Sequence, residues 1–218
     1  MAEHAPLTPK QHARAPHGQP RLNHAMTPTP QRLSLADLLQ CHTRGEDLWV
    51  FAYASLIWRP EFEPAQRRLA QVHGHHRALK MWSRINRGTY ERPGLVFALL
   101  PGGSCHGMVM QIPREQAEVA LHQLWAREMP TDTYTPRWLR AQTDQGPVRA
   151  LGFTLPKGHP QITGTLSRER YAEIFAHSQG RYGSTLDYAR ETLSGLRRVG
   201  IEDRALARLL AEVGLPPV

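Results

Sequence analysis

The sequence has only two cysteines, Cys41 and Cys105, so it cannot build a disulfide framework, and we expect both to be reduced thiols of a cytoplasmic protein. It has no run of about 18 apolar residues, which excludes a membrane-spanning helix. The opening residues MAEHAPLTPK lack the apolar core of a signal peptide, so secretion is not expected.

Several motifs that identify common cofactor sites are also missing. The chain has no GxxxxGK[ST], no GxGxxG, no paired CxxC and no HExxH, which removes the usual support for a nucleotide or zinc site. His73 and His75 are the best candidates for a metal, because alternate residues of a strand share a face and imidazole binds zinc. A zinc site needs three or four ligands and no third is evident, so we predict no metal and no cofactor.

Acidic residues are outnumbered, with 19 Asp and Glu against 27 Lys and Arg, a net charge of +8 and a pI near 10.1. Such a balance is compatible with a nucleic acid or a small anion as partner. No RNP, helix-turn-helix or zinc-finger motif is present, and the adjacent Arg197 and Arg198 are typical of a solvated helix face. We therefore predict a small anionic partner, with no nucleic acid, no membrane and no particular oligomeric state.

The first 33 residues differ in composition from the rest. They contain six of the 18 prolines, four histidines and almost no periodic apolar residues. Such a segment buries too little surface to offset the entropy of ordering it. We predict a disordered tail over 1–33 and one folded domain over 34–218.

The apolar pattern of the folded part predicts strands first and helices last. Ser34 is expected to cap a short helix over 35–41. Strands are expected at 48–53 and at 70–83, the latter broken by Gly74, and a hairpin at 95–112 that turns at PGGS. The remaining predicted elements, in order, are a helix at 114–128, a hairpin around DQGP, and helices near 168–178, 185–199 and 202–213. Without a repeated βαβ unit, this order favours an α+β fold, with a mostly antiparallel sheet or small barrel and packed helices.

One carboxylate of the helix at 114–128 lies in an unusual place. Glu128 follows Leu124 by four residues and Leu121 by seven, so it falls on the apolar stripe and not on the solvent face with Glu118. Burial disfavours the charged carboxylate and raises its pKa, which suits a general acid and base near neutral pH. The alternative is a structural ion pair, with Arg127 or another arginine as the partner.

The segment Tyr53-Ala54-Ser55-Leu56 is the second unusual stretch. A buried strand ends there in small residues, which let main-chain amides approach a ligand closely. Amides exposed at the end of a strand bind anions such as carboxylates. Small residues at the end of a strand are also common where no ligand binds.

Five segments together resemble the ordered motif series of the ChaC-type γ-glutamylcyclotransferases. They are VFAYASLIW, WSRINRGTYERPGLVFAL, GGSCHGMVMQIP, LWAREMPTDTYTPRWL and GSTLDYARETL, between roughly residues 48 and 205. The block LW-x-REM-x-x-x-x-Y-x-P-x-W is the most distinctive. The resemblance implies a small mixed β-barrel with helices.

The resemblance also implies an activity and a set of site residues. Enzymes of this family cleave glutathione to 5-oxoproline and cysteinylglycine without a cofactor. Glu128 matches the glutamate that serves the family as acid and base. The substrate-binding loop is matched by Val50, Phe51, Ala52, Tyr53, Ala54, Ser55 and Leu56, and Tyr188 is a further candidate for binding substrate. Arg87 is a candidate partner of a substrate carboxylate, although an arginine in such a turn is more often structural.

Two positions depart from the family pattern. Ala54 replaces a glycine, and if that residue has a positive φ, alanine is expected to cost about 1–2 kcal/mol. Thr185 stands where the family often has asparagine. The alternatives are therefore a cyclotransferase for other γ-glutamyl peptides or amines, and a catalytically weak relative that binds γ-glutamyl ligands or a protein.

Overall fold

The structure is a computed structural model, and it describes Met1 and residues 32–213. The predicted tail lies outside the described residues except for Met1, Arg32 and Leu33. Arg32 pairs with Asp132 at 2.6 Å, and the Leu33 amide donates to the carbonyl of Pro136 at 3.1 Å. The described fold therefore begins two residues before the Ser34 cap.

Helix α1 (Leu35–Thr43) starts where the capping signal predicts. The Ser34 hydroxyl accepts from the Asp37 amide, and the Asp37 carboxylate accepts from the Ser34 amide. This reciprocal pair satisfies two donors at the helix N-terminus.

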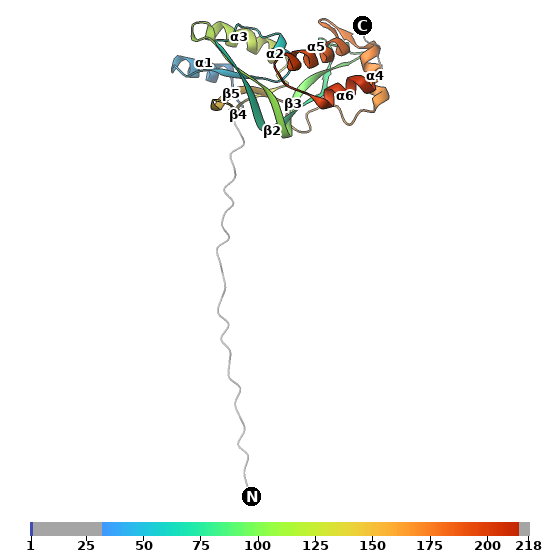
Figure 1. Cartoon of the computed structure of the whole chain (residues 1–218), viewed down its shortest axis with the longest axis horizontal. Coiled ribbons are helices and arrows are strands. Elements are labelled where there is room, and N and C mark those ends of the chain that lie inside the picture. The colour runs from blue at the N-terminus through green and yellow to red at the C-terminus, as the bar shows by residue number, and fades with distance from the viewer. Residues whose placement is uncertain (2–31, 214–218) are drawn as a thin grey trace.

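A closed five-stranded barrel forms the centre of the molecule (Figure 1). Its strands are β1 (Trp49–Ala52), β2 (Gln66–Ser83), β3 (Gly94–Gln111), β4 (Thr135–Thr143) and β5 (Gly146–Thr154). The order around the barrel is β1-β3-β2-β4-β5, and β1 closes it by running parallel to β5. The other main pairings are antiparallel, so the predicted mixed, mostly antiparallel barrel is confirmed.

The prediction of a hairpin within 95–112 is wrong, because β3 runs through PGGS as one strand paired with β2. Gly102 and Gly103 have φ of +98° and +70° and lie opposite Gly74, whose φ is +79°. Positive φ in a strand is typical of a bulge, which bends the pair without reversing it. The bulge also shifts the register between His73 and His75. The regular alternation that would place these two side chains on one face of the strand therefore does not hold.

The four helices predicted after the first strands are confirmed. The first of them, α3 (Ala117–Glu128), follows a 3-10 turn at Arg114–Gln116. A one-turn helix that the sequence did not predict, α2 (Ser55–Trp58), follows β1. The chain ends with α4 (Arg168–His177), α5 (Thr185–Arg198) and α6 (Arg204–Glu212). Between α4 and α5 lie two short strands that the sequence did not predict, β6 (Gln179–Gly180) and β7 (Gly183–Ser184).

The two groups of helices cover different parts of the barrel. Figure 1 shows α1 and α3 at one end of the molecule, α4 and α6 at the other, and α2 with α5 between them. Two large clusters of buried apolar side chains result. One fills the barrel and extends to α4, α5 and α6, and the other lies between the barrel and α1 with α3. None of the helices within 32–213 is long and apolar enough to cross a membrane.

Candidate active site

The chain turns sharply where β1 ends. Ala54 caps the N-terminus of α2, the Ile57 amide donates to its carbonyl at 2.9 Å, and the Arg59 amide donates to the Ser55 carbonyl at 2.7 Å. The amides of Ser55 and Leu56 precede the first hydrogen bond of α2, so they are candidates to meet an anion. The predicted turn at small residues is confirmed.

Ala54 does not have the positive φ that was considered from the sequence. Its φ is −143° and its ψ is −118°, so the penalty of a positive φ does not arise. The methyl group is buried in the barrel cluster beside Tyr53.

Glu128 is the last residue of α3, and its side chain is 14% exposed. Burial raises the pKa of its carboxyl, the Arg127 guanidinium opposes that rise, and the charge of Glu61 adds to it. Arg127 Nε lies 3.2 Å from Glu128 Oε1, so the ion pair considered from the sequence is present. The predicted desolvation is confirmed, and the pairing with Arg127 accompanies it.

Three tyrosine hydroxyls lie close enough to this carboxylate for its charge to influence their pKa values. Burial is the main cause that raises the pKa of each phenol, and the nearby charge of Glu128 raises it further. The three are Tyr53 at the end of β1, Tyr134 just before β4, and Tyr188 on α5. The site therefore draws its groups from four separate parts of the chain.

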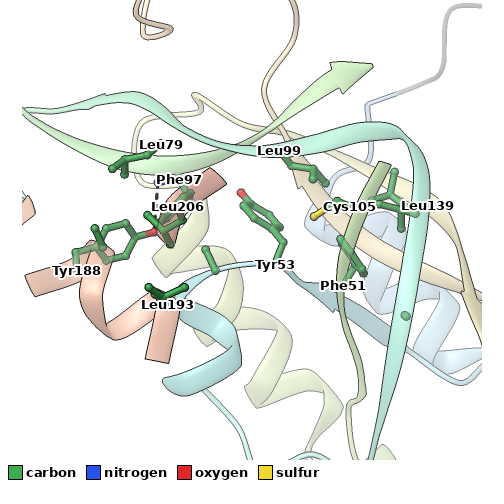
Figure 2. Close-up of a cluster of buried hydrophobic side chains, with 14 of the residues drawn as sticks. Phe51, Tyr53, Leu79, Phe97, Leu99, Cys105, Leu139, Tyr188, Leu193 and Leu206 are labelled. Atoms are coloured by element: carbon green, nitrogen blue, oxygen red, sulfur yellow. Dashed lines mark hydrogen bonds between the residues drawn. The ribbon is translucent and has the colours of Figure 1, made fainter. Parts of the chain in front are cut away.

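The tyrosines are held by main-chain atoms of the barrel. Tyr53 donates to the Phe153 carbonyl at 3.3 Å, and Tyr134 donates to the Phe97 carbonyl at 3.4 Å. The Phe97 amide donates to the Tyr188 hydroxyl at 3.4 Å, the contact drawn as a dashed line in Figure 2. Figure 2 also shows the Tyr53 ring lying between the groups around Tyr188 and Phe51.

Tyr188 connects the carboxylate to the turn and to a buried cation. Burial raises the pKa of its hydroxyl to about 12, and the nearby Ser55 hydroxyl opposes that rise. The Arg87 guanidinium lies 4.8 Å from the centre of the Tyr188 ring. Arg87 also donates to the Tyr182 carbonyl, and burial lowers its pKa. Its predicted contact with a substrate carboxylate stays a prediction.

The other residues of the predicted binding loop have buried side chains. Val50, Ala52 and Leu56 pack in the cluster with α1 and α3, and Phe51 packs inside the barrel. Only the main chain of this stretch is therefore suited to meet a ligand. Ser55 differs, because its hydroxyl accepts from Arg127 at 2.9 Å.

Thr185 has a structural role at the start of α5. Its hydroxyl accepts from the Leu95 amide at 3.0 Å and donates to the Arg87 carbonyl at 3.1 Å. The side chain thereby ties the start of α5 to β3 and to the loop that carries Arg87.

Tyr134 was missed as a site residue. It is the tyrosine of the distinctive block LW-x-REM-x-x-x-x-Y, but nothing in its local pattern distinguishes it from a core tyrosine. Within residues 32–213, no three His, Cys, Asp or Glu side chains lie together as a candidate metal site. The structure also has surface hollows of about 270 Å³ beside α4 and about 500 Å³ between α5 and α6, and neither is lined by Glu128 or by the tyrosines near it.

A desolvated carboxylate with a raised pKa, set among hydroxyls beside a sharp turn, is typical of general acid–base enzymes. The family model described as "ChaC-like protein" matches residues 48–215, and the chain belongs to this family. The match includes every group of the site described above.

Curated relatives and solved structures agree with this assignment. The chain is 33% identical over 181 residues to the glutathione-specific γ-glutamylcyclotransferase of Escherichia coli, covering 83% of this chain and 78% of that protein. It is 28% identical to glutathione-specific γ-glutamylcyclotransferase 1 of Homo sapiens, covering 94% and 92%. A yeast γ-glutamyl cyclotransferase specific to glutathione has the same fold, with a TM-score of 0.67 at 22% identity over 77% of this chain and 95% of that one.

Proposed function

We propose that this protein is a γ-glutamylcyclotransferase that cleaves glutathione to 5-oxoproline and cysteinylglycine. The observation that carries the proposal is the placement of Glu128, which is desolvated at the end of α3 and lies among Tyr53, Tyr134 and Tyr188. The names of the relatives support glutathione as the substrate.

The reaction is an internal exchange of one amide for another. The α-amine of the γ-glutamyl group attacks its own γ-carbonyl carbon, a five-membered lactam forms, and the bond to the cysteine nitrogen breaks. Overall, two protons leave the attacking nitrogen and two reach the departing nitrogen, so neither water nor an oxidant is consumed. Glu128 takes a proton from the α-ammonium and returns one to the leaving amine, work that is typically worth 10²–10⁴-fold in rate.

The turn after β1 binds and orients the γ-glutamyl group. The first amides of α2 hold its α-carboxylate or the oxyanion that forms at the γ-carbon, as fixed donors in a site with little water. Tyr53 and Tyr188 orient the chain so that the amine faces the carbonyl, which removes part of the entropic barrier to ring closure. In this proposal, Arg87 receives a second carboxylate of the substrate.

A cytoplasmic location fits this function. Both cysteines, Cys41 and Cys105, are free thiols in the structure, as expected for a reducing compartment. Fractionation of cells that express the full chain checks this part of the proposal.

The direct test is product analysis with the purified full chain. Incubation with glutathione is expected to release 5-oxoproline and cysteinylglycine in equal amounts. γ-Glutamyl peptides with another second residue serve as the comparison. If glutathione gave no 5-oxoproline while another γ-glutamyl compound did, the substrate assignment would be wrong. If no γ-glutamyl compound were cleaved, the assignment as a cyclotransferase would fail.

A further inference from the structure

Arg127 is shared between two carboxylates, one of which the reaction described above does not use. Its Nε is the nitrogen nearest to Glu128, at 3.2 Å. Its Nη1 donates to the Glu61 carboxylate and to the Arg59 carbonyl, the latter at 2.7 Å. Its Nη2 donates to the Ser55 hydroxyl at 2.9 Å. Both terminal nitrogens are therefore engaged by the segment from Ser55 to Glu61.

This arrangement gives Glu128 an incomplete ion pair. A guanidinium stabilises a carboxylate most when two parallel N–H groups meet its two oxygens. Here both terminal nitrogens of Arg127 bind Glu61 and the segment around α2, and the shortest contact of Arg127 with Glu128 is through Nε. Glu61 pairs with the Arg127 guanidinium, which would otherwise neutralise Glu128.

We propose that Glu61 is a positioning residue for the reaction, which holds the Arg127 guanidinium away from a two-pronged pairing with Glu128 and so keeps Glu128 basic enough to move the substrate's proton. The inference rests on the proposed function. Glu61 lies on the segment after α2 and its side chain is 32% exposed, so it acts from the edge of the site through Arg127.

The electrostatic surroundings of Glu128 agree with this arrangement. The charged groups that face it are Arg127 from its own helix and Glu61 from the segment after α2. The titratable groups that face it from the other elements are the hydroxyls of Tyr53, Tyr134 and Tyr188. Because the phenols stay neutral at working pH, the charges of Glu61 and Arg127 determine how readily Glu128 takes up a proton. The negative charge of Glu61 raises the pKa of Glu128, and Arg127 lowers it.

The test is the pH dependence of kcat/KM for glutathione in Glu61→Gln. Without the charge of Glu61, the Arg127 guanidinium loses its second carboxylate partner, turns toward Glu128 and neutralises it more fully. The acidic limb of the profile should move to lower pH by about one unit. Activity should therefore exceed that of the wild type at the acidic end and fall below it on the plateau, because Glu128 becomes a weaker base.

Two variants separate this effect from general damage. Glu63→Gln is the matched control, since Glu63 is two residues away, 85% exposed, and paired only with Arg67 among the contacts of the described chain. Glu63→Gln should leave the acidic limb of the pH profile at its wild-type position. Glu61→Asp keeps the negative charge and should also have the acidic limb of the wild type. A uniform loss of activity in Glu61→Gln with an unmoved limb would overturn the proposal. If Glu61→Gln did not fold, Glu61→Ala must show the same displacement.

A second readout does not depend on turnover. The difference in unfolding free energy between proteins with Glu128 and with Gln at that position changes with pH according to the pKa of Glu128. Its midpoint should lie at lower pH when Glu61→Gln is present in both proteins. An unmoved midpoint would overturn the role of Glu61 even if glutathione proved to be the wrong substrate, so the two failures are distinguishable.

Discussion

Arg77 donates a hydrogen bond of 3.0 Å to the main-chain carbonyl of Tyr53, and this contact ties β2 to the turn that begins the site. The same guanidinium pairs with Asp203 at 2.8 Å, and Asp203 caps α6 by accepting from the Leu206 amide. The side chains of Arg77 and Asp203 are only 7% and 13% exposed. The C-terminal helix and the Tyr53 turn are thus fixed by one buried ion pair.

Arg77→Met is expected to lower both stability and turnover. Removing one partner leaves the Asp203 charge buried, which typically costs about 3–5 kcal/mol, and it frees the Tyr53 carbonyl. Chemical denaturation and kcat for glutathione measure the two effects. The double variant Arg77→Met with Asp203→Asn should recover part of the stability, because it removes both charges.

Arg67→Met is the matched control for Arg77. Arg67 pairs with Glu63 on the surface, and exposed pairs contribute about 0–1 kcal/mol. Equal losses of stability in the Arg67 and Arg77 variants would show that the buried pair has no special importance.

Ala54→Gly is expected to leave turnover unchanged or raised, and to lower stability slightly. The φ of −143° means that alanine carries no positive-φ strain for glycine to relieve. Glycine adds freedom to the unfolded chain, which costs about 0.5–1 kcal/mol. Turnover and the unfolding free energy are measured together. A collapse of turnover in a stable protein would show that the turn depends on the Ala54 methyl group.

Two truncations of different length test how much of the N-terminal segment the fold needs. Removing residues 1–31 is expected to leave the melting temperature and activity nearly unchanged, since that segment is proline-rich and aperiodic. Removing residues 1–33 also deletes the contacts of Arg32 with Asp132 and of Leu33 with Pro136. Only the longer deletion should lower the melting temperature, and a large effect of the shorter one would contradict the prediction.

The sequence pattern predicted Glu128, and the family resemblance added Tyr53 and Tyr188, but neither indicated Tyr134 or Arg77, and the reason is physical. The position of Glu128 follows from the periodicity of one helix, which is local information. Tyr134 and Arg77 reach the site only because the barrel closes and brings β2 and the start of β4 to the end of β1. The PGGS segment was misinterpreted for the same reason: glycines favour both a reversing turn and a bulge, and only pairing with β2 decides between them.

The stability of the protein should depend on pH through Glu128. Its pKa is raised in the folded state, so the protonated carboxyl favours folding and the charged form opposes it. The associated stability is fully present below the pKa of an unfolded glutamate, and it is lost as pH rises through the raised folded value. Glu128→Gln cannot ionise, so its stability relative to the wild type should increase with pH across this window. Denaturation at several pH values measures the difference, and a decrease with pH would contradict the pKa direction.

Glu128→Gln should also abolish turnover while the protein stays folded. Glutamine has nearly the same shape, so the packing around this position should survive, and Arg127 keeps Glu61 as its partner. A carboxamide cannot take the ammonium proton or return it to the leaving amine, so kcat should fall by at least about 10². Binding of glutathione, measured by calorimetry, should persist because the turn at Tyr53–Ser55 is unchanged. The control is Glu118→Gln on the exposed face of α3, where kcat should stay near that of the wild type. A folded Glu128→Gln protein that retained most of its turnover would remove Glu128 from the reaction, and one that lost its fold would instead indicate that the pair with Arg127 is mainly structural.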